Sequence, residues 1–187
     1  MLDLDSVTGN NPFTKPQYRS IMGRYRPPSP PKSPYITESG YETLKQEAHD
    51  LWIRRRDVTK ALAAAAAEGD RSENAEYIYR KKELREIDYR IRYLQKRIPI
   101  LKVVNQPPSN PDQVFFAAWV QLETEDGDVR EYRIVGPDEL DSDPKNISLD
   151  SPLAQVLLKR TLDDQIEVET PAGITRYWIV DVRYELP

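Results

Sequence analysis

The sequence predicts an α+β protein, in which a long antiparallel coiled-coil hairpin is followed by a small, mainly antiparallel sheet domain with one short helix. Two apolar series repeat every three or four residues between residues 41 and 101, which is the spacing of a coiled-coil seam. From residue 114 the pattern changes to short aromatic and β-branched runs separated by turn residues, and such runs predict strands. We therefore expect an extension at 1–34, the coiled coil at 35–105, a linker at 106–111 and the sheet domain at 112–187.

The first segment is rich in proline. Residues 1–34 hold seven of the 16 prolines of the chain, and proline removes backbone donors and favours an extended backbone. The composition predicts a disordered extension. It is either a docking tail or a family-specific or wrongly assigned extension of the chain.

Local signals delimit the two arms of the hairpin. Thr37 is a suitable N-cap for a helix that begins near Glu38, and Gly69 is a suitable stop. Pro99 is expected to kink or end the second helix. An arm of about 30 residues extends roughly 45 Å. The seam positions are Tyr41, Leu44, Ala48, Leu51, Arg55, Val58, Leu62 and Ala65 in the first arm and Tyr77, Arg80, Leu84, Ile87, Ile91, Leu94, Ile98 and Leu101 in the second.

Arg55 is a charged side chain at a seam position that faces the partner arm. A long basic side chain can bury its stem and keep its charged end in water or against an acidic group. We therefore expect Arg55 to have a structural role.

Strands of the sheet domain are expected at residues 114–123, 129–135, 146–149, 166–169 and 175–184. Asp126-Gly127 is a hairpin turn signal between the first two strands, and residues 171–173 form the turn between the last two. Ser151 is expected to cap a short helix that begins with Pro152 and reaches about residue 160.

The composition excludes several classes of function. The absence of cysteine excludes disulfides, zinc ribbons and thiolate catalysis. No run of 18 or more apolar residues is present, which excludes a membrane span, so we expect a cytoplasmic protein. The net charge of −4 divides into +3 for residues 1–34, +3 for 35–105 and −10 for 106–187. The basic part suits nucleic acid, and the acidic part suits a protein partner.

The turn between the arms carries two carboxylates, Asp70 and Glu73. Their spacing resembles a capping box at the start of the second helix, where acidic side chains are also favoured by the helix dipole. The alternative is chemical, because two carboxylates on one turn can hold a hard divalent cation such as Mg²⁺. Two carboxylates alone bind Mg²⁺ weakly, so a second macromolecule would have to supply the remaining ligands.

Two further groups of residues have both a structural and a functional interpretation. Nine basic and three acidic side chains lie between residues 80 and 102, which describes either a solvated, salt-bridged helix face or a track for a phosphate backbone. The segment Asp150-Ser151-Pro152 opens the short helix, and it is either a helix cap or a protein-docking surface.

Seven segments carry a resemblance to a known family when they are taken together. They are residues 36–41 (ITESGY), 69–77 (GDRSENAEY), 82–88 (KELREID), 114–116 (VFF), 133–136 (RIVG), 147–152 (ISLDSP) and 170–173 (TPAG). Because these segments occur in this order, the chain from residue 35 to the end resembles the bacterial transcript cleavage (elongation) factors of the GreA/GreB family. Residues 1–34 have no counterpart in the common pattern of that family.

The resemblance implies a coiled coil joined to an FKBP-like C-terminal domain. Such factors bind RNA polymerase at its secondary channel and stimulate the polymerase's own cleavage of backtracked nascent RNA, so they rescue arrested complexes without being enzymes themselves. Asp70 and Glu73 would be the catalytic pair and would recruit a second Mg²⁺, shared with the polymerase active site, with Asp70 as the more direct contact. The free protein would hold no cofactor stably and would be a monomer. The resemblance also implies RNA contacts by Arg80, Lys81, Lys82 and Arg85 and polymerase docking by Asp150, Ser151 and Pro152.

Two competing functions remain open. A non-cleaving regulator of the secondary channel would need an altered tip, and the presence of both Asp70 and Glu73 argues against it. A prolyl isomerase or chaperone would act through the FKBP-like domain, but a fold by itself does not imply a function.

Overall fold

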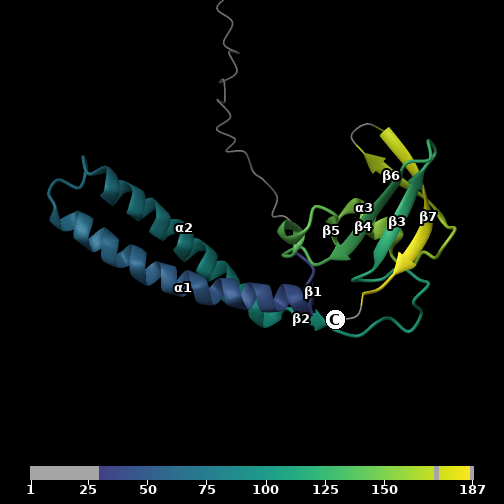
Figure 1. The fold of residues 1–187 in the computed structure, drawn as a ribbon, viewed down its shortest axis with the longest axis horizontal. Coiled ribbons are helices and arrows are strands. Elements are labelled where there is room, and N and C mark those ends of the chain that lie inside the picture. Colours follow the sequence, from purple (N-terminus) through teal and green to yellow (C-terminus); the bar gives the residue numbers. More distant parts are fainter. Residues whose placement is uncertain (1–29, 171–172, 186–187) are drawn as a thin grey trace, which may run out of the picture. The chain divides into compact units, whose positions relative to one another are not determined.

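The computed structural model describes residues 30–170 and 173–185. Within them the chain forms a hairpin of two long helices, a two-stranded pair at its base and a five-stranded sheet with a short helix (Figure 1). The predicted α+β fold class is confirmed. The predicted extension lies outside the described residues except for 30–34. None of the helices in the described part is long and apolar enough to cross a membrane.

The start of the first long helix and the end of the second fall where the local signals predict. Helix α1 (Glu38–Ala67) begins after Thr37, whose hydroxyl accepts a hydrogen bond of 3.1 Å from a backbone N–H of the first turn. Helix α2 (Ala75–Arg97) gives way to a single 3₁₀ turn, η1 (Ile98–Ile100). This turn contains Pro99, which cannot continue the hydrogen-bonded helix, so the predicted helix end is confirmed.

The helices pack antiparallel along the predicted seam. Burial of one Leu or Ile side chain contributes about 1.5–3 kcal/mol, so packing of this face stabilises the arms more than helix propensity does. Arg55 extends its Nε to the Asp88 carboxylate at 2.7 Å, which confirms its expected structural role. The buried seam residues are Leu44, Val58 and Ala65 in α1 and Ile87, Ile91 and Leu94 in α2.

The base of the hairpin differs from the prediction of a coiled coil across residues 35–105. Strand β1 (Tyr35–Thr37) pairs in parallel with β2 (Lys102–Val104), and Ile36 is fully buried there. Because the two arms are antiparallel and of similar length, the residues before α1 and the residues after α2 lie side by side and can pair. Each strand has only three residues, which is too short for the alternation that identifies a strand in a sequence.

The C-terminal sheet has the strand order β5-β4-β3-β7-β6. Neighbouring strands are antiparallel, except that β5 runs parallel to β4. Side chains from the sheet and α3 form one core, in which Val120, Ile134, Leu157 and Ile179 are fully buried. The elements are β3 (Trp119–Thr124), β4 (Val129–Val135), β5 (Asn146–Ser148), α3 (Pro152–Leu157), β6 (Gln165–Thr170) and β7 (Gly173–Arg183).

Two expected boundaries in this domain are wrong. The first strand begins at Trp119 rather than at residue 114, because Ala117 has a φ of +68° that interrupts an extended run. Helix α3 ends at Leu157 rather than near residue 160, because the backbone leaves the helix at Leu158 (ψ of 132°) and is left-handed at Lys159 (φ of +66°). The predicted hairpin turn at 126–127 is confirmed, whereas residues 171–172 lie outside the described part.

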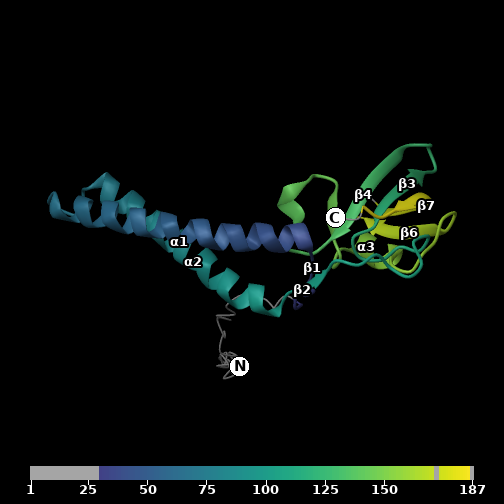
Figure 2. The same cartoon turned by 60° about the horizontal axis from the view of Figure 1, so that its bottom comes forward.

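A loop after β4 ties the bases of both arms to the sheet (Figure 2). The Glu139 carboxylate accepts a hydrogen bond from the Thr37 N–H (3.1 Å) and another from the Thr37 hydroxyl, at the start of α1. The neighbouring Asp138 accepts one from Arg97 Nε (2.7 Å) and another from the Tyr93 hydroxyl, near the end of α2. Two adjacent carboxylates of this loop therefore each hold the base of one arm: one at the start of α1 and one near the end of α2.

Candidate functional site at the hairpin tip

The turn between α1 and α2 holds both tip carboxylates in exposed positions. Asp70 Oδ1 accepts hydrogen bonds from the hydroxyl (2.6 Å) and the N–H (2.8 Å) of Ser72. These two bonds lower the pKa of the Asp70 carboxyl below its ordinary value, so the group is ionised at neutral pH. Oδ1 is thereby oriented, while Oδ2 accepts no hydrogen bond from any described residue.

Asn74, rather than Asp70 or Glu73, caps the second helix. Its side-chain oxygen accepts a hydrogen bond from the Tyr77 N–H (3.0 Å), which is the ordinary N-cap interaction. Its amide group donates to the Ala65 carbonyl oxygen (3.0 Å) and so joins the two helices. The capping-box interpretation of the tip carboxylates is therefore wrong, and the capping signal in the sequence was the asparagine that follows them.

Glu73 leaves its carboxylate available to an external ligand. Its N–H donates to the Asp70 carbonyl oxygen (3.3 Å), which keeps the two residues on one turn. Its carboxylate forms no hydrogen bond or ion pair with any residue that the structure describes. Gly69 makes this sharp turn possible, because its φ of +138° is a conformation that other residues rarely adopt.

The tip can supply part of a magnesium coordination shell. Mg²⁺ prefers about six oxygen ligands and is commonly bound by one or two carboxylates together with waters and substrate phosphates. Among the described residues, no group of three or more His, Cys, Asp or Glu side chains is placed to hold a metal ion. Asp70 and Glu73 would supply two carboxylates to such a shared site, and another molecule would have to supply the remaining ligands.

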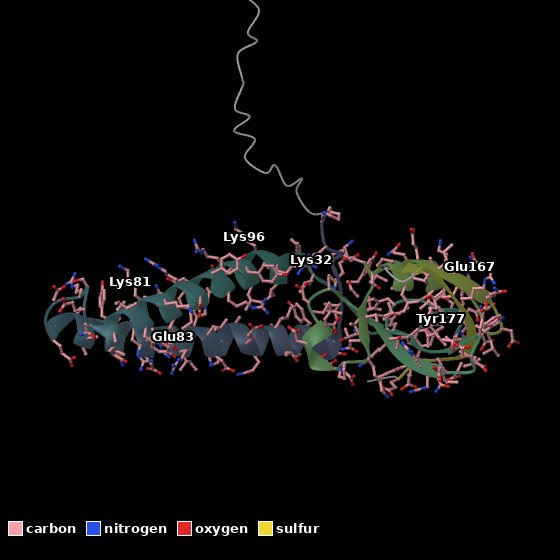
Figure 3. All side chains as sticks on the ribbon, turned by 90° about the horizontal axis from the view of Figure 1, so that it is seen from above. Lys32, Lys81, Glu83, Lys96, Glu167 and Tyr177 are labelled. Carbon is pink, nitrogen blue, oxygen red and sulfur yellow. The ribbon has the colours of Figure 1, made fainter. Side chains whose placement is uncertain are left out.

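The four basic residues singled out near the tip differ in their surroundings. Arg80 is half-buried and pairs with Glu76 (2.7 Å) and Glu83 (2.9 Å), so its charge is neutralised within the helix. Lys81 is exposed and lies over a tyrosine ring at 5.5 Å from its centroid. Figure 3 shows Lys81 on the side of α2 away from α1, and Glu83 on the side toward it.

Lys82 and Arg85 are both exposed. Lys82 is 3.9 Å from a carboxylate oxygen of Glu86, and Arg85 forms no ion pair with any described residue. Of the four residues, Lys81, Lys82 and Arg85 therefore present available charge, and Arg80 does not.

The three expected docking residues at the start of α3 differ in their surroundings. Ser151 is the N-cap, since its hydroxyl accepts a hydrogen bond from the Ala154 N–H (3.2 Å), and Pro152 is exposed at the first helical position. The Asp150 carboxylate accepts hydrogen bonds from the N–H (2.9 Å) and the hydroxyl of Ser33. No pattern in the sequence links these two distant residues, so sequence reasoning missed this contact.

Comparison with known proteins assigns the chain to a family. A model described as "Transcription elongation factor, N-terminal" matches residues 34–103, and one described as "Transcription elongation factor, GreA/GreB, C-term" matches residues 108–184. The transcription elongation factor GreB of Pseudomonas aeruginosa is 54% identical over 164 residues, which cover 87% of this chain and 98% of that protein. The chain belongs to the GreA/GreB family of transcription elongation factors.

A second GreB is similarly close, and two solved structures are more distant in sequence. The GreB of Xanthomonas axonopodis is 53% identical over 87% of this chain and 98% of that protein. Among solved structures, GreA factor homolog 1 of Thermus thermophilus covers 80% of this chain and 97% of its own, at 24% identity and a TM-score of 0.37. A GreA/GreB factor from Nitrosomonas europaea covers 81% of this chain and 100% of its own, at 21% identity and a TM-score of 0.38.

Proposed function

We propose that this chain binds RNA polymerase in its secondary channel and stimulates the polymerase's own cleavage of backtracked nascent RNA. The observation that carries the proposal is the tip of the hairpin, where Asp70 and Glu73 share one exposed turn and neither caps a helix. Membership of the GreA/GreB family supports the same function. The chain itself is then not an enzyme but a cofactor of the polymerase, and it acts in the cytoplasm as a monomer.

In this proposal the two tip carboxylates share a Mg²⁺ with the polymerase active site. A bound Mg²⁺ supplies an activated water and stabilises the charge that develops on the scissile phosphate. Asp70 would contribute the more direct ligand, because the hydrogen bonds from Ser72 already orient its carboxylate. Glu73 would hold the metal or its bound water. Because the tip supplies only two carboxylates, the free chain holds the ion weakly.

The remaining surfaces support the same function. Exposed cations near the tip suit the phosphates of extruded RNA, and Lys81, Lys82 and Arg85 are the ones with available charge. The start of α3, with Asp150 and Pro152, is proposed as part of the surface that meets the polymerase. The long arms separate the two surfaces, so one can dock while the other reaches the reacting phosphate.

The test is RNA cleavage in a stalled, backtracked polymerase complex with Mg²⁺. We expect rapid cleavage with the wild-type chain and little with Asp70→Ala or Glu73→Ala, while competition binding shows that both variants still bind the polymerase. Glu68→Ala is the matched control, because Glu68 is another exposed carboxylate at the same tip, and it should cleave normally. A wild-type chain that binds but does not cleave would make it a non-cleaving channel regulator.

A further inference from the structure

A row of four cations and one tyrosine runs along α2 on the side opposite the seam. At about 100° per residue, these five residues fall within an arc of about 80°, and the seam residues of α2 centre about 160° away. Figure 3 shows Lys96 projecting from this outer side. We call this row the outer stripe, and its members are Lys82, Arg85, Tyr89, Arg92 and Lys96.

The cations of the outer stripe remain largely unneutralised. Arg85 and Lys96 form no ion pair with any residue in the described part of the chain. Lys82 has only the distant contact with Glu86 at 3.9 Å, and Arg92 Nε donates to a backbone carbonyl oxygen one turn earlier (3.2 Å). The acidic residues of α2 lie outside this arc, so no carboxylate of this helix stands within the stripe.

Tyr89 stands in the middle of these cations with its ring open to solvent. It is 71% exposed, more than any other large apolar or aromatic side chain in the described part of the chain. Its ring has no contact with a cation of the described residues. The neighbouring Tyr79 provides a contrast, because the Arg80 guanidinium lies over its ring at 5.3 Å. At about 100° per residue, it lies about 100° around the helix from the centre of the stripe.

We propose that Tyr89 is a stacking platform for a base of single-stranded RNA that runs along the outer stripe. Proteins that bind single strands combine a positive track for the phosphates with exposed aromatic rings for the bases, and the stripe has both. The proposal rests on the proposed function, in which extruded RNA follows this arm. It adds a contact to a base and extends the RNA surface from Arg85 to Lys96.

The position of Tyr89 along the helix sets the length of RNA that it can contact. It lies 14 residues beyond the start of α2 at Ala75, which corresponds to about 21 Å from the tip. At a stacked spacing of about 3.4 Å, this distance is about six nucleotides. Tyr89 therefore acts on RNAs that are extruded by about six nucleotides or more.

The first experiment measures binding of a fluorescent single-stranded oligoribonucleotide to the full chain at low salt, by anisotropy. Loss of one stacked base weakens binding roughly 5- to 150-fold, which is the change expected for Tyr89→Ala. Tyr89→Phe keeps the ring and should bind like the wild type, as should the matched control Tyr79→Ala. Equal affinity of Tyr89→Ala and the wild type, or no binding by the wild type, overturns the proposal.

The second experiment separates this inference from the proposed function. The oligonucleotide measurement contains no polymerase, so it stands even if the wild-type chain fails to stimulate cleavage. In backtracked complexes, Tyr89→Ala should slow cleavage of RNAs extruded by more than about six nucleotides and leave shorter ones unaffected. An equal loss on short and long RNAs would mean that Tyr89 contacts the polymerase instead, and would overturn the assignment.

Discussion

The substitution Asp138→Ala should destabilise the protein, because it leaves a buried guanidinium without its counter-charge. The side chains of Arg97 and Asp138 are only 8% and 4% exposed, and Nε lies 2.7 Å from Oδ2. Removal of one member of a buried ion pair costs about 3–5 kcal/mol. Arg97 keeps its hydrogen bonds to the carbonyl oxygens of Lys32 (3.4 Å) and Ser33. We therefore expect the lower end of this range, about 3 kcal/mol.

Urea unfolding measures this loss. With a slope of about 1–3 kcal/mol per molar urea, a loss of about 3 kcal/mol lowers the midpoint by roughly 1–3 M. The control is Asp141→Ala, an exposed carboxylate of the same loop, which should change stability by less than about 0.5 kcal/mol. The double variant Asp138→Ala/Arg97→Leu should recover part of the loss, since neither buried charge then remains unpaired. A loss below about 1 kcal/mol for Asp138→Ala would refute this reasoning.

Three other substitutions test separate parts of the structure. Asn74→Ala removes the cap of α2 and should cost about 1 kcal/mol in thermal unfolding; an unchanged midpoint would contradict the capping role. Gly136→Ala would place a Cβ against a β1 carbonyl oxygen and should lower the free energy of unfolding in urea by about 1–3 kcal/mol. An unchanged free energy of unfolding would show that the loop shifts to accommodate the added methyl group. Hydrogen bonds from Lys145 and Arg183 lower the pKa of Glu131 from 4.5 to about 2. Because the folded-state pKa is depressed, its stabilisation is present above about pH 4.5 and is lost as the pH falls toward 2. The stability difference between wild type and Glu131→Gln should shrink over that range, and a constant difference would argue against the ion pair.

Much of the fold was predictable because local signals and periodicity agree. The cap at Thr37, the stop at Gly69 and the break at Pro99 each act on the neighbouring backbone, so they can be recognised without tertiary information. The seam was equally clear, since it repeats over many turns. By contrast, β1 and β2 form only when the hairpin brings distant residues together, and the left-handed backbone at Ala117 shows no signal in the residue type.

The candidate site was predicted in its position but not in its local chemistry. The sequence places Asp70 and Glu73 on one turn, but it does not show whether they cap the helix, because Asn74 competes for the same role one residue later. The structure resolves this competition in favour of Asn74. Similarly, only the structure shows that Arg80 is neutralised by two glutamates.

The measurement that tests the central claim most directly is the Mg²⁺ dependence of RNA cleavage in backtracked complexes. It compares saturating wild-type chain with Asp70→Asn, which keeps an oxygen to accept the Ser72 hydrogen bonds but removes the charge. If the tip recruits the metal, the variant needs a higher Mg²⁺ concentration for half-maximal cleavage and regains part of its rate when Mg²⁺ is raised. An unchanged half-maximal concentration with a lower plateau would contradict metal recruitment by Asp70.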